Sequence, residues 1–384
     1  MGRRLNFRLG KKELMTTRTK PPFRADHVGS FLRSARLKAA RVQHGAGEIT
    51  AEQLRAVEDE EIETLVRHQE SCGLKLATDG EFRRAWWHFD FLGLLDGVDV
   101  VEADQGIQFA GVQTKPLTLK VTGKVGFPSD HPFLDHFRFL KATTNVMPKM
   151  TIPAPTVLHF RGGRRAISST VYPEMEQFFA DAGAAYAKAV RAFYDAGCRY
   201  LQFDDTAFAY LCSPAEREKA KQRGDDTEGL QDKYAGMINA ALAAKPADMT
   251  ITTHICRGNF RSTWVSEGGY EPVAETLLGR CNYDGYFLEY DSERAGGFEP
   301  LRFLPKGDKQ VVLGLITSKS GTIESRDDIK RRIEEAAKFA PIEQFCLSPQ
   351  CGFASTEEGN ELTEDAQWAK MREVVAISEE VWGR

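Results

Sequence analysis

The stretch Thr253-His254-Ile255-Cys256-Arg257-Gly258-Asn259-Phe260 begins at the end of an apolar run that is typical of a buried β-strand. In a strand, residues i and i+2 point to the same side, so His254 and Cys256 can offer an imidazole and a thiolate to one metal ion. The pair alone fits a buried cysteine beside a histidine equally well. Glu289 and Cys351 share the same setting, because each follows another apolar run. The fold then decides whether the four residues meet.

Apolar runs of strand length recur along the chain and alternate with helical patterns. Strands are predicted at 23–31, 76–81, 149–158, 199–204, 249–255, 284–289, 310–316 and 344–348. Helices are predicted at 51–72, 174–196, 226–244, 325–339 and 364–381, with Thr50 as the N-cap of the first. This alternation predicts an α/β fold, a (β/α)8 TIM barrel, with an open doubly wound sheet as the alternative.

Residues 82–148 interrupt the alternation between the second and third predicted strands. They hold an aromatic cluster around Trp86 and an alternating segment at 117–125 that predicts an antiparallel ribbon. We interpret them as an insertion in a single catalytic barrel spanning 21–384. Residues 1–20 are basic and without periodicity, and they are expected to form a disordered tail.

Composition narrows the class of function. The chain has 384 residues and a net charge of −4, with both signs spread along it, which argues against nucleic acid or a membrane surface as a partner. Seven cysteines without framework spacing, and no apolar run of membrane-spanning length, favour a cytoplasmic protein that acts on small molecules.

Polar residues gather at the predicted strand ends, where the active sites of barrels lie. They are Ser30, Glu81, His159, Asp204, Asp205, His254, Cys256, Glu289, Lys319 and Cys351.

One histidine, two cysteines and one glutamate form a borderline-soft ligand set, which favours Zn²⁺ over Mg²⁺ or Ca²⁺. In the alternative interpretation Glu289 pairs with Arg257 or Arg294, and the cysteines are simply buried.

Three further residues suggest an amino-acid substrate. Glu81 and Asp204 can bind an ammonium group, while Ser30 and backbone N–H groups near Gly29 can hold a carboxylate. Asp205 fits loop capping as well as binding.

Two features stay ambiguous. Trp86 and Trp87 can pack the insertion onto the barrel, which we favour, or stack on a planar donor. The turn 161–165, rich in arginine, can bind an anionic tail or lie in solvent.

Six motifs occur in the order found in cobalamin-independent methionine synthases, whose C-terminal catalytic barrel the chain resembles from about Phe23 to Trp382. They are Val28-Gly29-Ser30-Phe31, Asp79-Gly80-Glu81-Phe82, Gln202-Phe203-Asp204-Asp205, Thr253-His254-Ile255-Cys256, Leu288-Glu289 and Ser348-Pro349-Gln350-Cys351-Gly352.

The resemblance implies methyl transfer to the thiolate of homocysteine, giving methionine, with 5-methyltetrahydrofolate as one donor. It implies homocysteine bound through its carboxylate by Ser30 and the Val28 backbone, and through its amine by Glu81 and Asp204. We also expect Asp204 to act in catalysis. It implies zinc bound by His254, Cys256, Glu289 and Cys351.

The chain departs from the family on the donor side. It resembles short relatives that lack the second, N-terminal barrel. Phe160 stands where the family has a tryptophan that stacks on the pterin. Residues 317–320 replace a histidine thought to handle a proton, and Lys319 is our candidate general acid or anion-binding group there.

Two rival functions stay open. One is a zinc-dependent thiol alkyltransferase of the epoxyalkane–coenzyme M type, and the other is a barrel that binds zinc or an amino acid without catalysis. The donor, folate, corrinoid or a small S-methyl compound, is not fixed by the sequence, and a methyl-donor protein or a homo-oligomer also stays open.

Overall fold

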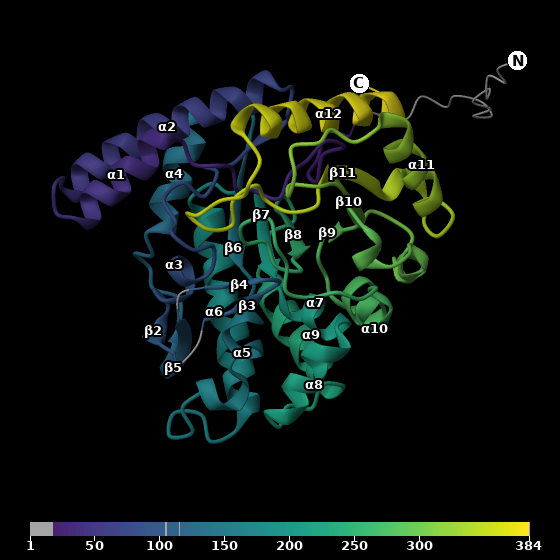
Figure 1. Cartoon of the computed structure of the whole chain (residues 1–384). Coiled ribbons are helices and arrows are strands. Elements are labelled where there is room, and N and C mark those ends of the chain that lie inside the picture. Colours follow the sequence, from purple (N-terminus) through teal and green to yellow (C-terminus); the bar gives the residue numbers. More distant parts are fainter. Residues whose placement is uncertain (1–17, 104–105, 115, 384) are drawn as a thin grey trace, which may run out of the picture.

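The computed structural model describes residues 18–103, 106–114 and 116–383, and it centres on seven parallel strands (Figure 1). They lie side by side in chain order and are β1 (Leu76–Ala77), β6 (Met147–Pro153), β7 (Tyr200–Asp205), β8 (Thr250–Ile255), β9 (Gly285–Glu289), β10 (Gln310–Ile316) and β11 (Phe345–Pro349). Helical segments join most consecutive strands, so the predicted TIM-barrel type of α/β fold is confirmed.

The strand register places the strand ends at one level. Asp204 in β7 lies opposite His254 in β8, and Glu289 in β9 lies opposite Gly314 in β10. Residues along β8 to β11 are almost all buried, as expected for a parallel sheet that is covered on both faces. Polar residues at the strand ends therefore lie near one another although they are far apart in sequence.

The prediction of a regular first strand at residues 23–31 was wrong, because this segment forms no regular strand. The segment makes one isolated parallel bridge, Ala25 to Leu347 of β11. Asp26 donates its N–H to the Leu347 oxygen at 3.0 Å, and Leu347 donates to the Arg24 oxygen at 2.8 Å. The segment thus pairs with the free edge of β11 over a very short length.

A side chain explains the interruption. The Asp26 carboxylate accepts the backbone N–H groups of Phe23 at 3.0 Å and His27 at 2.8 Å, in competition with a strand ladder. Further along, Phe31 donates its N–H to the oxygen of Gly80, just past β1, at 3.2 Å. Residues 23–31 therefore bridge β11 and the end of β1, and they take the eighth place in the ring.

The same carboxylate is tied into the barrel interior. Lys149 of β6 donates to Asp26 at 3.0 Å, and the Tyr200 hydroxyl of β7 donates to it at 2.9 Å. All three residues are fully buried. A paired buried charge of this kind is costly to break, so the network fixes segment 23–31 inside the ring.

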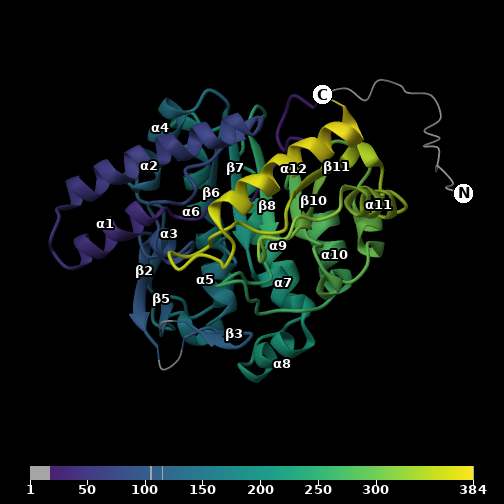
Figure 2. The ribbon, with the colours of Figure 1, turned by 45° about the horizontal axis from the view of Figure 1, so that its top comes forward.

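Helices surround the sheet (Figures 1 and 2). They are α1 (Ala35–Gly45), α2 (Ala51–Ser71), α3 (Phe89–Leu92), α4 (Phe133–Thr143), α5 (Val157–Phe160), α6 (Met175–Asp195), α7 (Ala207–Cys212), α8 (Pro214–Gln222), α9 (Gly229–Leu242), α10 (Glu271–Ala274), α11 (Arg326–Ala336) and α12 (Glu364–Trp382). A π-helical turn, η2 (Glu275–Arg280), follows α10, and 3-10 turns are η1 (Gly163–Ala166), η3 (Glu293–Ala295), η4 (Glu299–Phe303) and η5 (Ile342–Gln344).

The long helices match their predictions closely. Thr50 caps α2 and forms a capping box with Gln53, as its sequence position predicts. Helix α6 packs beside α9, and α12 packs on β11 and α11. The amphipathic pattern found these helices because each buries one face against the sheet.

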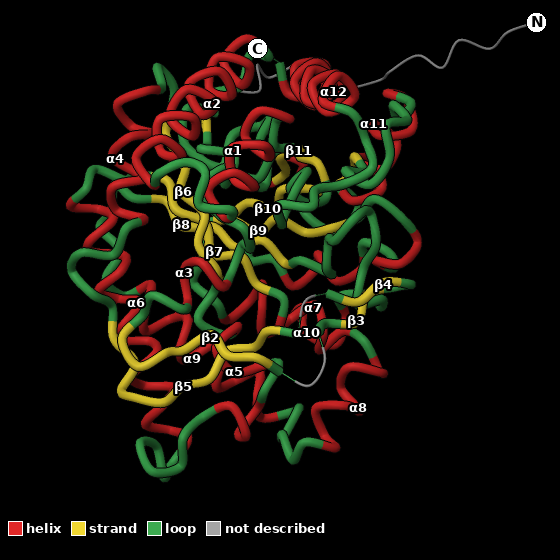
Figure 3. Tube along the Cα trace, turned by 60° about the vertical axis from the view of Figure 1, so that its left-hand side comes forward, coloured by secondary structure: helices red, strands yellow, loops and turns green. Residues whose placement is uncertain are grey.

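The insertion is confirmed between β1 and β6. Strands β2 (Asp96–Glu102) and β5 (Leu117–Gly126) form the antiparallel ribbon, which lies apart from the barrel strands in Figure 3. Between them, β3 (Gln108–Phe109) and β4 (Val112–Gln113) form a small hairpin. Helix α4 contacts α2, β6 and α6, so it belongs to the helical layer of the barrel, and the inserted part ends before it.

Two sequence expectations touch the limits of the described chain. The tail predicted at 1–20 falls mainly on residues 1–17, which lie outside the described residues. Within the described part, no helix is long and apolar enough to cross a membrane.

Candidate metal centre and substrate cavity

Four side chains from three strand ends form a cluster at one mouth of the barrel. His254 belongs to β8, Cys256 directly follows it, Glu289 ends β9, and Cys351 lies two residues past β11. One ligand atom from each lies within 4.8 Å of the other three, and we call these residues the cluster. The structure brings together the four residues that the sequence proposed as ligands.

The spacing suits a tetrahedral ion. The sulfurs of Cys256 and Cys351 lie 3.7 Å apart, and Nε2 of His254 lies 4.0 Å from Oε1 of Glu289. Two thiolates bound to zinc at about 2.3 Å in a tetrahedron would lie about 3.8 Å apart. The sulfur pair therefore fits zinc without movement.

Unpartnered polar atoms support the same assignment. Both ring nitrogens of His254 and Oε2 of Glu289 are buried without a hydrogen-bond partner in the described structure. Such atoms cost about 1–3 kcal/mol each unless something binds them. Oε1 of Glu289 accepts the backbone N–H of Arg257 at 2.9 Å, which leaves Oε2 as the atom available to an ion.

The alternative pairing of Glu289 with an arginine is not what the structure shows. The Arg294 guanidinium lies 3.2 Å from Asp291. The Arg257 guanidinium lies over the Tyr270 ring, 4.4 Å from its centroid. Glu289 contacts Arg257 through the backbone only among the interactions of the described residues.

The cluster is electrostatically strained without a cation. Burial raises the pKa of Glu289 to about 7, and the negative charge of Cys351 adds to the effect. The hydrogen bond between the sulfurs lowers the pKa of Cys351 and raises that of Cys256. A cation would relieve this crowding of anionic groups, since it stabilises the ionised form of each.

Glu81, Asp204 and Ser30 line the same cavity as His254, Cys256 and Cys351 of the cluster, and we call these three the carboxylate end. Oε1 of Glu81 accepts a hydrogen bond from Thr151 at 2.9 Å, while Oε2 is buried and unpartnered. Asp204 accepts from Gln202 at 2.7 Å. Burial, together with the negative charge of Glu81, raises the pKa of Asp204 to about 7. The Arg84 guanidinium lies 3.4 Å from Oε1 of Glu81, so Oε2 of Glu81 and the Asp204 carboxylate are the groups available to a cationic ligand.

The backbone near Ser30 is closely packed. Gly352 lies so near that a Cβ there would sit 1.9 Å from the Ser30 hydroxyl oxygen. That hydroxyl accepts the N–H of Ala354 at 3.3 Å. Val28 also lines the cavity, and its carbonyl accepts from Gln202 at 2.7 Å. Asp205 instead caps the start of α7 through the N–H of Ala207 at 2.6 Å, as the capping alternative expected.

Lys319 does not line the cavity with the other predicted residues. Its ammonium group donates to Asn259 at 3.1 Å and to the backbone oxygens of Thr263 at 3.2 Å and Gly258 at 3.4 Å. Asn259 in turn donates to the Gly352 oxygen at 2.7 Å. Lys319, in the loop after β10, therefore ties that loop to the loop after β8, and its predicted acid role stays a prediction.

The aromatic residues singled out in the sequence do not all lie at the cavity. Phe160 lies outside the residues that line the cavity and packs against Tyr210, with ring centroids 5.5 Å apart. Trp86 and Trp87 do line the cavity, and Trp86 also stacks on Phe260 at 5.9 Å. The tryptophan pair therefore packs the insertion and faces the cavity at once. His159 is also away from the cavity, hydrogen-bonded to Tyr234 at 2.9 Å.

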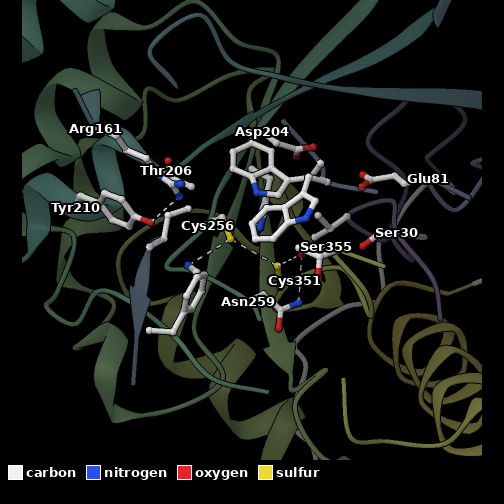
Figure 4. Close-up of a pocket in the computed structure, with 18 residues that line it drawn as sticks. Ser30, Glu81, Arg161, Asp204, Thr206, Tyr210, Cys256, Asn259, Cys351 and Ser355 are labelled. Carbon is white, nitrogen blue, oxygen red and sulfur yellow. Dashed lines mark hydrogen bonds between the residues drawn. The ribbon is translucent and has the colours of Figure 1, made fainter. Parts of the chain in front are cut away.

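A third part of the cavity holds Arg161, Thr206 and Tyr210, and we call it the Arg161 end. Figure 4 shows it on the side of the cluster opposite to Ser30 and Glu81, with two indole rings between. The hairpin of the insertion contributes Ile107 and Phe109 to the lining.

Sequence reasoning missed several lining residues. Asn259 and Ser355 follow the cluster cysteines in the same loops, so their neighbourhood in sequence was a usable signal. Tyr210 lies on a short helix, and Phe109 comes from the insertion. No local pattern indicates that these two reach the cavity.

Comparison with known proteins agrees with this geometry. The family model for the cobalamin-independent synthase catalytic domain matches residues 23–377. YxjG of Bacillus subtilis (strain 168), described as an uncharacterized protein, is 55% identical over 95% of this chain and 96% of its own length. A Listeria monocytogenes crystal structure, provisionally named a vitamin-B12 independent methionine synthase, has 46% identity and a TM-score of 0.76, covering 94% of this chain and 99% of that one.

A more distant relative carries a defined activity in its name. The 5-methyltetrahydropteroyltriglutamate–homocysteine methyltransferase of Bacillus cytotoxicus is 24% identical over 86% of this chain. The match covers 40% of that enzyme's length, so this chain corresponds to a part of it.

Proposed function

The chain belongs to the family of the cobalamin-independent synthase catalytic domain, and we propose that it transfers a methyl group to the thiol of homocysteine to give methionine. The observation that supports this proposal best is that His254, Cys256 and Cys351 of the cluster line one cavity with the carboxylate end. A thiol with an α-amino-acid group fits both parts at once. The distant relative named for homocysteine methylation supports the same acceptor.

The residues of the chain would bind and orient the acceptor. Glu81 and Asp204 would hold the ammonium group between two carboxylates, and the Ser30 hydroxyl would donate a hydrogen bond to the substrate carboxylate. The rigid strand ends then fix where the sulfur lies. Orientation of this kind makes an in-line displacement effectively unimolecular.

We propose that His254, Cys256, Glu289 and Cys351 hold Zn²⁺. When bound there, zinc would lower the pKa of the substrate thiol, so that the nucleophilic thiolate is present at neutral pH. Oε2 of Glu289 and both ring nitrogens of His254 are buried and without a hydrogen-bond partner among the described residues, which suits them to this role.

A direct assay tests the proposal. Zinc-loaded protein is incubated with homocysteine and, in turn, with methyl-folate of one or three glutamates, methylcobalamin and a small S-methyl compound. Methionine is measured by mass spectrometry. We expect methionine with at least one donor, and none after the metal is removed with a chelator. Binding of homocysteine without methionine from any donor would support the non-catalytic interpretation instead.

Arg161 favours a second candidate, a thiol alkyltransferase acting on a sulfonated thiol such as coenzyme M, because a guanidinium in the cavity suits a sulfonate. The carboxylate end argues for an amine-bearing thiol instead. Calorimetric titration with homocysteine and with coenzyme M separates the two, and we expect homocysteine to bind more tightly.

A further inference from the structure

Arg161 is a partly buried cation that lines the substrate cavity and forms no ion pair with the residues that the structure describes. The residue follows α5 and lines the cavity beside Thr206 and Tyr210 (Figure 4). Its Nη2 donates to the Tyr210 hydroxyl at 3.2 Å, which fixes the plane of the guanidinium. Its Nε is buried without a hydrogen-bond partner. Among the described residues, this is the one hydrogen bond that the guanidinium makes, so most of its five N–H donors are available to a ligand.

Neighbouring arginines are satisfied differently. Arg223 lies 3.4 Å from the Asp225 carboxylate and donates to the Phe160 oxygen at 2.8 Å. Arg164 donates to the Met175 sulfur at 3.2 Å and lies outside the cavity lining. No carboxylate of the described chain forms an ion pair with Arg161. A partly buried guanidinium that lines a cavity, keeps free N–H donors and has no carboxylate partner suits an anion.

The surroundings of Arg161 keep its charge uncompensated. Burial lowers the pKa of His88 well below its usual value, and the positive charge of Arg161 lowers it further. His88 contacts the ring of Trp87, with centroids 4.6 Å apart. The guanidinium thus lies near a neutral imidazole and aromatic rings, none of which can neutralise its charge. An anionic ligand could do so.

The cavity is therefore bipolar. Glu81 and Asp204 give the cavity two carboxylates, and Arg161 gives it a guanidinium, which Figure 4 shows on the side of Cys256 opposite to Glu81. If the proposed function holds, the ammonium and carboxylate groups of homocysteine bind at the carboxylate end. The Arg161 end is then left for the second substrate.

We propose that the Arg161 end binds an anionic group of the methyl donor, a carboxylate or a phosphate, while Trp86 and Trp87 contact the donor's planar part. This inference rests on the proposed function and adds the chemical class of the donor. A bidentate guanidinium contact would hold the donor in one orientation relative to the cluster, which a neutral or cationic donor could not use.

The test measures donor binding directly. Zinc-loaded wild-type protein and the variants R161Q and R161K are titrated by calorimetry, in the presence of homocysteine, with two probes. One is the triglutamate of 5-methyltetrahydrofolate, which offers carboxylates, and the other is methylcobalamin, which offers a phosphodiester. The matched control is R164Q, whose arginine lies in the same turn outside the cavity lining.

We expect R161Q to weaken binding of one probe roughly 10- to 100-fold, as the loss of a charge-assisted contact predicts. R161K should weaken it less, because it keeps the charge and loses the planar fork. R164Q should stay within about twofold of wild type. Zinc content and the homocysteine Kd, which report a folded site, should be unchanged in all three. The probe that responds identifies the source of the anion.

Three results would overturn the inference. Neither probe binds the wild-type protein, both bind R161Q as tightly as wild type, or R161Q weakens the acceptor thiol instead of the donor. Methionine formation is measured separately, so the two proposals fail independently. Donor binding that depends on Arg161, without methionine formation, would refute the methyl transfer and support the anion site. Methionine formation with a donor KM that R161Q leaves unchanged would support the methyl transfer and refute the anion site.

Discussion

The cluster and the Arg161 end lie in one cavity but are built in different ways. The cluster stands at the ends of β8, β9 and β11, whose parallel register fixes the relative heights of its residues. The Arg161 end comes from the segments around α5 and α7, and the insertion lines the cavity beside it with Ile107 and Phe109. Strand ends thus provide a rigid centre, and loops provide the variable part. In barrels this division lets one scaffold keep a reaction while it changes a substrate.

The largest effect is expected from breaking the cluster. Cys256→Ser removes a sulfur that lies 3.7 Å from Cys351, so we expect zinc affinity and methionine formation to fall together by at least about 100-fold. Zinc is measured by mass spectrometry of the purified protein. The control is Cys72→Ser at the end of α2, outside the cluster. Full zinc content and activity in Cys256→Ser would refute the ligand assignment.

The next effect concerns the carboxylate end. Glu81→Gln or Asp204→Asn should weaken homocysteine binding about 10- to 100-fold, since each removes a charged partner of the ammonium group. Binding is measured by calorimetry, with 4-mercaptobutyrate as the matched ligand that lacks the amine. The variants should lose the preference for homocysteine over this analogue. An equal loss for both thiols would mean that the carboxylates act on the fold and do not recognise the amine.

Acid should weaken the base of the insertion more than the cluster. Nε2 of His131 lies 3.2 Å from the Phe91 oxygen of α3, and Phe133 donates its N–H to Nδ1 at 3.3 Å, which requires a neutral ring. Burial lowers the pKa of His131 to about 4. In the unfolded chain a histidine pKa is about 6.5, so the unfolded state binds more protons between pH 6.5 and 4, and stability falls as pH falls through that window.

From pH 7 to pH 5 this group should cost about 2 kcal/mol of unfolding free energy. Urea unfolding of wild type and His131→Asn at the two pH values measures it, and His44→Asn on the exposed part of α1 is the control. The asparagine variant should show a smaller loss on acidification. An unchanged pH dependence would remove His131 from the account.

The smallest effect is expected at Lys319, which supports the cluster from outside. Lys319→Met should release zinc to a chelator about tenfold faster, because the loop after β8, which carries Cys256, loses its hydrogen bonds from Lys319 to Asn259 and Gly258. Lys319→Arg should recover much of the retention. Lys330→Met on α11 is the matched control. Normal zinc retention with lost activity in both Met and Arg variants would favour the proton-donor role predicted from the sequence.

Local periodicity explains what could be predicted. The period of two in strands placed His254 and Cys256 on one side, and the helical period located α2, α6 and α12 within a few residues. Such patterns show which residues of one element are buried, and that information lies within the sequence of the element itself. Segment 23–31 escaped because the Asp26 carboxylate takes backbone N–H groups that a strand would use.

The sequence by itself determined the barrel class, the chemical types in the cluster and the residues of the carboxylate end, because these follow from strand ends in a parallel sheet. Only the tertiary structure decided that the Lys319 ammonium is hydrogen-bonded to the loop after β8, and that Phe160 packs against Tyr210 outside the cavity lining. It also decided that Trp86, Tyr210 and Arg161 line one cavity with His254, Cys256 and Cys351 of the cluster. The physical reason is that these contacts join segments far apart in the chain through side-chain packing, which leaves no periodic trace in either segment.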